Sequence, residues 1–381
     1  MKIAQLITDD REPTRQYDLP APYFGTAPTA LLEGFAKMPG VEVHIVSCSK
    51  RPMVSPEKLA PNIYFHSVIV PSIGWLKTGY QGCIRAARRK LHELQPDIVH
   101  GQGCERDQNI SAVLSGFPNV ITIHGNMRLV ARLMHARPFS FHWLAARLEA
   151  FTIPRAGGVV CITSYTREAV ASLARRTWLL PNAVDSAFFD IVAVPSPTRR
   201  ILCVGMVDGR KNQIALIRAL DTVSRPPDLE LLFLGGIPNG SEYGREFLKL
   251  VAERPWCRYG GFANRKTLRE YFTSAHGLVL PSLEDNCPMV VLEAMASGVP
   301  VAAANVGGVP DLVRDGETGV LFDPLDPASI AQGMTQLFST GPGSPMAVRA
   351  RKEARARFHP DVVAARHLEI YREVLAAPKG A

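Results

Sequence analysis

The sequence predicts an α/β fold of two Rossmann-like domains, each with a doubly wound parallel sheet. Three observations lead to this expectation. The chain has 381 residues, more than one hydrophobic core comfortably serves. Short apolar runs typical of buried strands alternate with helical segments along nearly the whole chain. The alternation is interrupted by a proline-containing stretch at 190–199 and then starts again, which is typical of an interdomain linker.

The expected elements follow from the same patterns. In the first half, apolar runs predict strands at 2–7, 42–48, 64–70, 98–101, 120–124, 158–163 and 178–180. Helical periodicity predicts helices near 28–37, 81–94, 107–114, 127–150 and 165–173. After the linker, strands are expected at 200–204, 229–234, 277–280 and 300–304.

These elements give an N-terminal domain over 1–190 and a C-terminal domain over 199–359, followed by a helix at about 360–377. In such folds ligands bind beyond the carboxyl ends of the parallel strands. We therefore expect the site where these ends of the two domains face each other.

Composition narrows the class of protein. Apolar residues make up 46% and charged residues 20%, as in an ordinary globular chain, and no apolar run approaches the ~18 residues that span a bilayer. The first ten residues turn acidic too early for a secretory signal and instead predict a strand. The seven cysteines include no C-x-x-C pair, so we expect reduced thiols in a cytoplasmic protein, with neither a zinc site nor disulfides.

The net charge of +8 suggests that the protein has an anionic partner. No recognised nucleic-acid motif or aromatic–basic repeat is present, so we expect no nucleic-acid partner. An anionic nucleotide or an anionic membrane surface explains the sign equally well.

The stretch 277–301 is the most informative in the chain. It predicts a buried strand, an acidic loop with Asp285, a helix that starts at Pro288 and stops at Gly298, and a second strand. Asp285 and Glu293 can then both face the crevice beyond the strand, next to free backbone N–H groups that suit a phosphate. The alternative is two solvated acids around an ordinary helix.

This segment resembles the signature of family 4 retaining glycosyltransferases of the GT-B fold, in which two such domains face each other across a deep cleft. Seven residues separate the two acids, as in that family, although the first acid is usually Glu and here is Asp285. The resemblance implies that Glu293 holds the ribose hydroxyls and Asp285 the transferred sugar. It also implies donor contacts from Asn286, Met289 and Val290.

A second motif lies at 204–212, the first strand-to-helix turn after the linker. Gly205 lets the backbone approach a phosphate, and Lys211 brings a mobile positive charge; the alternative is a solvated surface lysine. The family resemblance places Lys211 on the donor diphosphate. Relatives usually carry Arg at the position of Met206, and Arg210 is our candidate for the missing charge.

Two motifs in the first half complete the expected site. His124 and Gly125 end a buried strand, where a neutral imidazole can hydrogen-bond a sugar or phosphate, or simply be a satisfied structural histidine. The resemblance favours a donor-contacting His124. The long connection from Thr8 to about Ala27 carries Gly25 where relatives have a Gly-Gly pair, and Gly25 can offer its N–H to phosphate.

A basic helix suggests a membrane partner. Arg85, Arg88, Arg89 and Lys90 lie on one expected helix, and a second basic–apolar stretch runs from 128 to 147. Relatives dock on anionic membranes through such helices to reach lipid-linked acceptors. The alternative is an ordinary amphipathic helix with a solvated face.

Taken with these features, the family resemblance implies a cytoplasmic, retaining, metal-independent hexosyltransferase without a cofactor, peripheral on the inner membrane face if the basic helix binds lipid. Its donor is a nucleotide-diphosphate sugar, UDP-linked in preference to GDP-mannose. Its acceptor is a saccharide or a lipid-linked group in glycan or polysaccharide biosynthesis. Two alternatives stay open: a nucleotide-sugar epimerase on the same fold, and a nucleotide-binding pseudo-enzyme subunit, which Met206 and Asp285 make conceivable.

Overall fold

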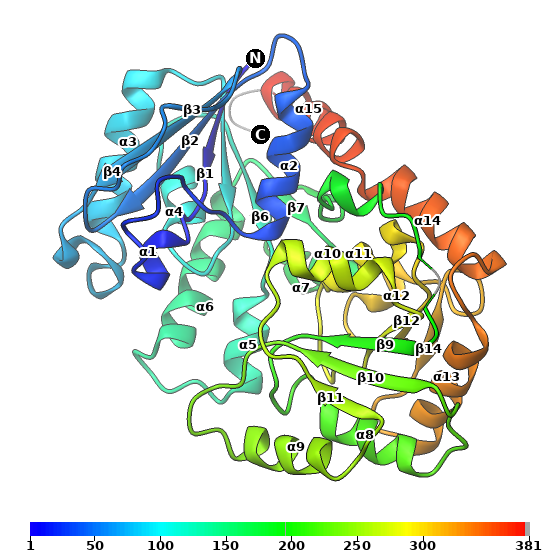
Figure 1. The fold of residues 1–381 in the computed structure, drawn as a ribbon. Coiled ribbons are helices and arrows are strands. Elements are labelled where there is room, and N and C mark those ends of the chain that lie inside the picture. The colour runs from blue at the N-terminus through cyan, green and yellow to red at the C-terminus, as the bar shows by residue number, and fades with distance from the viewer. Residues whose placement is uncertain (195, 378–381) are drawn as a thin grey trace. The chain divides into compact units, whose positions relative to one another are not determined.

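The computed structural model describes residues 1–194 and 196–377 and divides into two compact units (Figure 1). The first unit comprises Met1–Ala183 together with the chain from Pro360 to the described end. The second unit is Val184–His359. The change of unit at 183–184 precedes the stretch 190–199 that the sequence marked as the linker, and the described residues of that stretch belong to the second unit.

The first unit is built on one eight-stranded sheet of order β3-β4-β2-β1-β5-β6-β7-β8. Every pairing in it is parallel except that of β3 with β4. The strands are β1 (Lys2–Leu6), β2 (Glu42–Ser49), β3 (Lys58–Ala60), β4 (Ile63–Ile69), β5 (Ile98–Gln102), β6 (Asn119–Ile123), β7 (Val159–Cys161) and β8 (Thr177–Leu179). The central strands are almost entirely buried, as continuous apolar strands of a parallel sheet should be.

The helices of this unit are α1 (Arg11–Thr14), α2 (Thr26–Ala36), α3 (Gln81–Leu94), α4 (Gln108–Val113), α5 (Met127–Leu133), α6 (Phe141–Thr152), α7 (Ser164–Val170) and α15 (Pro360–Ala376). Helix α15, near the C-terminus, lies beside α2, which is near the N-terminus (Figure 1). Phe35 of α2 stacks on Tyr371 of α15 with ring centroids 6.3 Å apart. The apolar face of the last helix is therefore part of the first unit's core.

The second unit contains a six-stranded, all-parallel sheet of order β11-β10-β9-β12-β13-β14. Its strands are β9 (Arg199–Val204), β10 (Leu229–Leu234), β11 (Cys257–Tyr259), β12 (Gly277–Leu280), β13 (Val301–Ala304) and β14 (Val320–Phe322). Its helices are α8 (Gln213–Asp221), α9 (Glu242–Ala252), α10 (Arg265–Thr273), α11 (Met289–Ser297), α12 (Val309–Leu312), α13 (Pro327–Ser339) and α14 (Pro345–Phe358). Two apolar cores flank the sheet, so the prediction of two doubly wound α/β domains is confirmed.

The single helix expected over 127–150 is wrong. Two helices, α5 and α6, occupy this stretch, and they pack against each other. Pro138 lies between them and cannot donate the backbone hydrogen bond of a continuing helix. His135 and Phe139 adopt positive φ angles of 45° and 64°, which reverse the chain. The sequence pattern also missed the three-residue strands β3, β11 and β14, which are too short to show a period.

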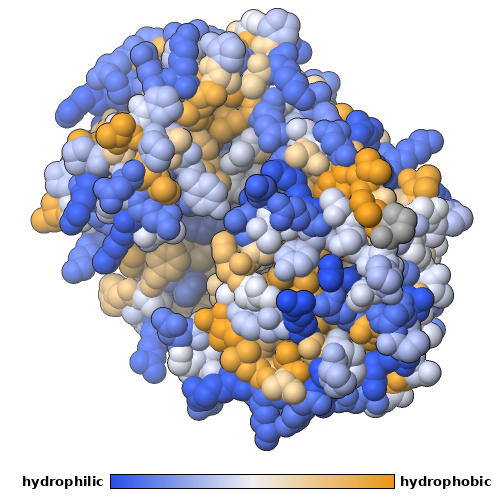
Figure 2. All heavy atoms as spheres, viewed as in Figure 1, coloured by the Kyte–Doolittle hydropathy of each residue, from blue (hydrophilic) through white to orange (hydrophobic). Residues whose placement is uncertain are grey.

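The surface carries no continuous apolar belt on the face drawn in Figure 2, where hydrophilic residues surround separate hydrophobic patches. Among the helices that the structure describes, none combines the length and the apolar character needed to cross a membrane.

Candidate active site

The second unit has its topological switch point between β9 and β12. These strands are neighbours, yet the chain leaves β9 towards β10 on one side and β12 towards β13 on the other. The loops that follow them therefore diverge and open a crevice at the carboxyl edge of the sheet. A backbone hydrogen bond from Leu283 N to Arg210 O, 2.7 Å long, joins the two loops.

Two ion pairs also connect these loops. Lys211 Nζ lies 2.5 Å from Asp285 Oδ2, and both side chains are largely buried. Arg210 Nη1 lies 3.3 Å from Glu284 Oε2 and is half-exposed. The structure thus joins the two motifs through one Lys211–Asp285 pair and one Arg210–Glu284 pair. Met206, at the position where relatives usually carry Arg, is 54% exposed.

Glycines let the backbone pack closely around the pair. A Cβ on Gly205 would lie 3.5–3.7 Å from the side-chain carbons of Lys211, so the lysine runs along Gly205. Gly307 has a φ of +55°, and a Cβ there would lie 2.0 Å from the carbonyl oxygen of Asp285. Gly308 N donates to the same oxygen at 3.0 Å. The turn at Gly307 therefore packs directly against the backbone of Asp285 and fixes the position of its loop.

Helix α11 begins directly after this loop. Pro288 is its N-cap, so the helix begins at Met289, one residue later than the start at Pro288 that the sequence predicted. The helix stops at Gly298, whose φ is 74°. Asn286, Met289 and Val290 are half-buried at its start. The first-turn N–H groups of this nine-residue helix give the crevice a positive end beside Asp285.

Glu293 occupies a different environment from Asp285. It is only 1% exposed, and it forms an ion pair with Arg265 of α10. Arg265 and Arg269 also reach Asp185, at 3.9 and 3.1 Å. Burial raises the pKa of Glu293, and the Arg265 guanidinium opposes that rise. The sequence analysis missed Arg265, because nothing in its local pattern marks it as the partner of an acid on another helix.

A hollow lies next to the same loops. Its volume is about 310 Å³, and it is lined by Leu283, Asn305, Val306, Asp323, Pro324 and Leu325. Asn212 Nδ2 donates to the Pro324 carbonyl at 3.1 Å and ties this wall to the end of the Lys211 turn.

The first unit repeats this layout at β1 and β5, which are neighbours with diverging connections. Gly25 is the N-cap of α2, which starts two residues before the expected helix, so the first-turn N–H groups of α2 begin there. The long loop before it contains α1 and a buried ion pair between Asp9 and Arg11, 2.7 Å apart. The loop is thus an ordered segment held by its own charges.

His124 follows β6 directly and lines a small cavity of about 10 Å³ with Ala27, Asn182 and His367. Burial lowers its pKa to about 4, so its imidazole is neutral at pH 7. Its Nε2 lies 3.0 Å from Gln102 Oε1. Because the amide of Gln102 donates to Gln5 Oε1 at 3.1 Å, its oxygen is left to accept the proton of His124 Nε2.

The polar network continues from Gln5 to the C-terminal helix. Gln5 Nε2 donates to the Tyr371 hydroxyl at 3.4 Å, and that hydroxyl lies 2.6 Å from His100 Nδ1. His100 Nε2 in turn lies 2.7 Å from Thr122 Oγ1. The sequence analysis missed this network, since its members come from β1, β5, β6 and α15.

The predicted basic face of α3 is present, and Arg85, Arg88 and Arg89 are exposed. Lys90 pairs with Glu93 at 2.5 Å. The second basic–apolar stretch, 128–147, lies in the α5–α6 hairpin, which exposes apolar side chains: 58% at Leu133, 60% at Met134 and 81% at Phe139. Arginines of the same hairpin, Arg132 and Arg137, are exposed beside them.

The described residues of the two units thus provide cations and helix N–H groups for an anion, and carboxylates for hydroxyl groups. Comparison with known proteins agrees with this chemistry. Residues 198–340 match the family described as glycosyl transferases group 1, and residues 28–188 match glycosyltransferase family 4.

Among characterised proteins, the chain is 26% identical over 304 residues to alpha-maltose-1-phosphate synthase of Mycolicibacterium smegmatis, covering 70% of this chain and 76% of that protein. It is 32% identical over 157 residues to D-inositol 3-phosphate glycosyltransferase of Corynebacterium diphtheriae, covering 40% of this chain and 37% of that protein.

Solved structures share the fold over the full length. Sucrose-phosphate synthase from Thermosynechococcus elongatus superimposes with a TM-score of 0.77 at 19% identity, covering 99% of this chain and 100% of that one. Anabaena HepE, solved in complex with UDP and glucose, gives 0.67 at 16% identity, covering 98% and 100%. The two family matches and these structures show that the chain has the GT-B fold, belongs to glycosyltransferase family 4 and is a glycosyltransferase.

Proposed function

We propose that the protein transfers a sugar, with retention of anomeric configuration, from a nucleotide-diphosphate sugar to a saccharide or lipid-linked acceptor in glycan biosynthesis. A UDP-sugar is the favoured donor, and GDP-mannose is the second choice. The observation that carries the proposal is the Lys211–Asp285 pair at the switch point of the second unit, beside the start of α11. The solved relative with bound UDP and glucose supports the choice of donor class.

In this proposal the donor diphosphate replaces Asp285 as the partner of Lys211. The lysine and the first-turn N–H groups of α11 then stabilise the negative charge that grows on the departing diphosphate. Arg210, now held by Glu284, is the second cation available to the same group. Because this leaving-group charge is met by protein cations, we propose a metal-independent reaction.

The acids take the hydroxyl-binding roles. Asp285, released from Lys211, accepts hydrogen bonds from the transferred sugar, and Glu293, with its charge held by Arg265, accepts them from the ribose. In the first unit, neutral His124 and the N–H groups at Gly25 contribute hydrogen bonds to the sugar and phosphates. Each of these residues is assigned a non-covalent contact with the donor, and none of them acts as a nucleophile that forms a covalent bond to the sugar. Such roles suit front-face departure and therefore retention.

Calorimetric titration with UDP, GDP, ADP and CMP tests the donor site. We expect micromolar binding of one diphosphate, weakened at least about 10-fold in Lys211→Ala, since a phosphate-binding cation contributes a charge-assisted hydrogen bond. Lys249→Ala is the matched control, because Lys249 is an exposed lysine on α9 of the same unit. No binding by the folded wild-type protein, or equal loss in both variants, would exclude the proposed site.

Turnover assays distinguish the two alternatives. Proton NMR of the product reports whether the anomeric configuration of the donor is kept, and addition of a chelator tests metal independence. Consumption of donor without any acceptor would indicate an epimerase, and binding without consumption in a broad acceptor screen would indicate a pseudo-enzyme.

We further propose a peripheral contact with an anionic membrane through the first unit. The exposed arginines of α3 and the apolar tip of the α5–α6 hairpin provide the two attractions that interfacial binding requires. Flotation with anionic vesicles should be reduced by Arg85→Glu with Arg88→Glu, and separately by Leu133→Ser with Phe139→Ser. Absence of flotation by the wild-type protein would remove this partner.

A further inference from the structure

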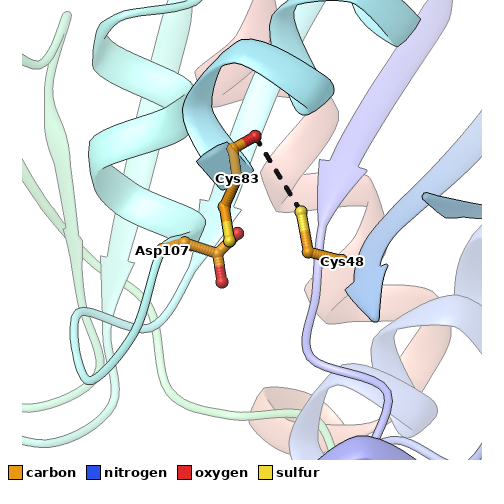
Figure 3. Close-up of side chains that lie close together, drawn as sticks. All are labelled: Cys48, Cys83 and Asp107. Atoms are coloured by element: carbon orange, nitrogen blue, oxygen red, sulfur yellow. Dashed lines mark hydrogen bonds between the residues drawn. The ribbon is translucent and has the colours of Figure 1, made fainter. Parts of the chain in front are cut away.

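A cluster of two thiols and a carboxylate lies in the first unit, apart from every residue assigned above. It consists of Cys48, Cys83 and Asp107 (Figure 3). One ligand atom from each side chain lies within 4.8 Å of the other two. The glycosyl-transfer chemistry uses none of the three.

Three separate elements supply these side chains. Cys48 is near the end of β2, Cys83 is in the first turn of α3, and Asp107 is the N-cap of α4. Helix α3 packs against both β2 and α4, which brings the three together. Their wide spacing in the sequence explains why the cysteine pattern predicted no metal site.

The surroundings are closed and mostly apolar. Cys83 is 0% exposed and Asp107 6% exposed, while Cys48 is partly buried. Val70, Trp75, Ile84 and Ile110 form the adjacent core together with Tyr80. A carboxylate among apolar side chains is costly unless it is paired, and Asp107 has Arg106 as a nearby positive charge.

The hydrogen bonds that this cluster makes within the protein are long. Gln108 Nε2 donates to Asp107 Oδ1 at 3.3 Å. Cys48 Sγ donates to the Cys83 carbonyl at the long distance of 3.9 Å, drawn in Figure 3. Burial raises the pKa of the Asp107 carboxyl, and a hydrogen bond from Cys48 opposes the rise. Thiols are weak donors, so this arrangement leaves a stronger partner to be gained.

The donor set suits a borderline-soft divalent cation. Zinc binds Cys sulfur at about 2.3 Å and Asp oxygen at about 2.0–2.2 Å, which places the ligand atoms of a tetrahedral site roughly 3.5–3.8 Å apart. Because the three ligand atoms already lie within 4.8 Å of one another, side-chain shifts of about 1 Å would bring them to this spacing. Magnesium and calcium prefer all-oxygen sites, and thiolates select against them.

We propose that Cys48, Cys83 and Asp107 form a zinc-class metal site that joins β2, α3 and α4 of the first unit. Three protein ligands leave one coordination position, which a water molecule completes. Binding converts two thiols to thiolates, so each metal ion displaces about two protons into solution. The proposal does not rest on the proposed function, because none of the three side chains has a role in it.

Cobalt(II) is a suitable probe because its thiolate complexes absorb visibly. Reduced, full-length protein freed of metal by a chelator should bind one Co²⁺ per chain, with thiolate-to-cobalt absorption that Zn²⁺ abolishes by displacement. Zinc should also raise the thermal unfolding temperature. Calorimetry in buffers of different ionisation enthalpy should report release of about two protons.

Variants locate the site. Cys48→Ser, Cys83→Ser and Asp107→Asn should each weaken binding by more than the 10–100-fold typical of a lost outer partner. Cys161→Ser is the matched control, because Cys161 is an equally buried thiol on β7 of the same unit, and it should bind like wild type. The metal-free unfolding temperature shows which variants are folded. Since Cys48 is the least buried ligand, its variant retains the test if Cys83→Ser does not fold.

Two results would overturn the proposal. One is the absence of saturable Co²⁺ or Zn²⁺ binding by reduced, folded wild-type protein. The other is binding that survives unchanged in Cys48→Ser, which would place the metal elsewhere. In the first case, a loss of two hydrogens by mass spectrometry after exposure to an oxidant such as air would identify Cys48 and Cys83 as a disulfide-forming pair in place of metal ligands.

Discussion

At the scale of single residues, backbone geometry decides how the reactive groups are held. Asp285 is supported by Gly307, whose positive φ and close approach to the Asp285 carbonyl leave no room for a side chain. Gly316 has a comparable φ of +70°, yet a Cβ there would meet nothing within 4 Å. Substitutions at the two glycines can therefore be compared: both carry the energetic cost of a left-handed backbone, but only the one at Gly307 also crowds the Asp285 loop.

We predict that Gly316→Ala lowers the free energy of unfolding by about 1–2 kcal/mol, the cost of a left-handed alanine. Gly307→Ala should cost at least about 1 kcal/mol more, and it should weaken binding of the nucleotide sugar about 10-fold, because Asp285, which we assign to the transferred sugar, must move. Chemical denaturation and calorimetry measure the two effects. Equal effects of both variants on binding would show that Gly307 does not position Asp285.

Buried histidines such as His367 make the stability of the first unit depend on pH. His367 of α15 contacts the Val363 carbonyl through Nδ1 at 2.9 Å, and burial lowers its pKa to about 4. A histidine of lowered pKa contributes no penalty above its unfolded pKa of about 6.5, where it is neutral in both states. As the pH falls from 6.5 towards 4, the unfolded state binds the proton first and stability is lost.

His367→Gln removes this contribution. Between pH 7 and pH 5 we expect the stability advantage of wild type over the variant to shrink by about 2 kcal/mol. The loss begins at the unfolded pKa of about 6.5, and each of the roughly 1.5 pH units from there to pH 5 costs about 1.4 kcal/mol. Denaturation curves of both proteins at the two pH values measure the difference, which cancels the titration of all other groups. A gap that stays constant with pH would contradict the buried neutral histidine.

At the scale of elements, the packing of α15 on α2 completes the first unit. Gly34 of α2 is the contact point, because a Cβ there would lie 2.3 Å from the Pro360 carbonyl oxygen and 2.7 Å from Ala364 Cβ. The chain reaches this contact only after passing through the whole second unit. Residues distant in sequence therefore share one core.

Gly34→Ala tests this packing, because the contact predicts that the substitution destabilises the protein instead of stabilising it. On an exposed helix the change to alanine would stabilise by about 1 kcal/mol, since glycine is a poor helix former. Here we predict a net loss of about 1–3 kcal/mol, because the added methyl group separates the two helices. Thermal unfolding gives the sign, and faster hydrogen exchange in α15 would locate the loss. A stabilised variant would contradict the contact.

At the scale of the whole molecule, each unit has its own sheet and its own apolar cores. The cations that we assign to the diphosphate, Lys211 and Arg210, both belong to the second unit. A nucleoside diphosphate without a sugar should therefore bind and stabilise mainly that unit.

Hydrogen exchange followed by mass spectrometry measures this directly. With the diphosphate selected by calorimetry at 100 times its Kd, we expect protection of the second unit equivalent to about 2.7 kcal/mol, strongest around 205–212 and 283–293. Protection confined to the first unit would place nucleotide binding there and contradict the assignment of Lys211.

The sequence by itself determined the fold class and pointed to the loops to which we assign the chemistry. Alternating strands and helices predict doubly wound sheets, and such sheets bring ligands to the carboxyl ends of their strands. The motifs around Lys211 and around Asp285 each fall at such an end, so their meeting follows from topology. The family follows from the same residues, because their order and spacing are local properties of the chain.

Only the tertiary structure decided which side chains become partners. The Arg265–Glu293 pair, the network from His124 to Tyr371, and the cluster of Cys48, Cys83 and Asp107 each join elements far apart in the sequence. No local period records such contacts, since they depend on which strands are neighbours and how helices cover them. The chain reversal at Pro138 is a different case: apolar residues continue on both sides of it and hide it from helical periodicity, although the proline itself is a local signal that a helix ends.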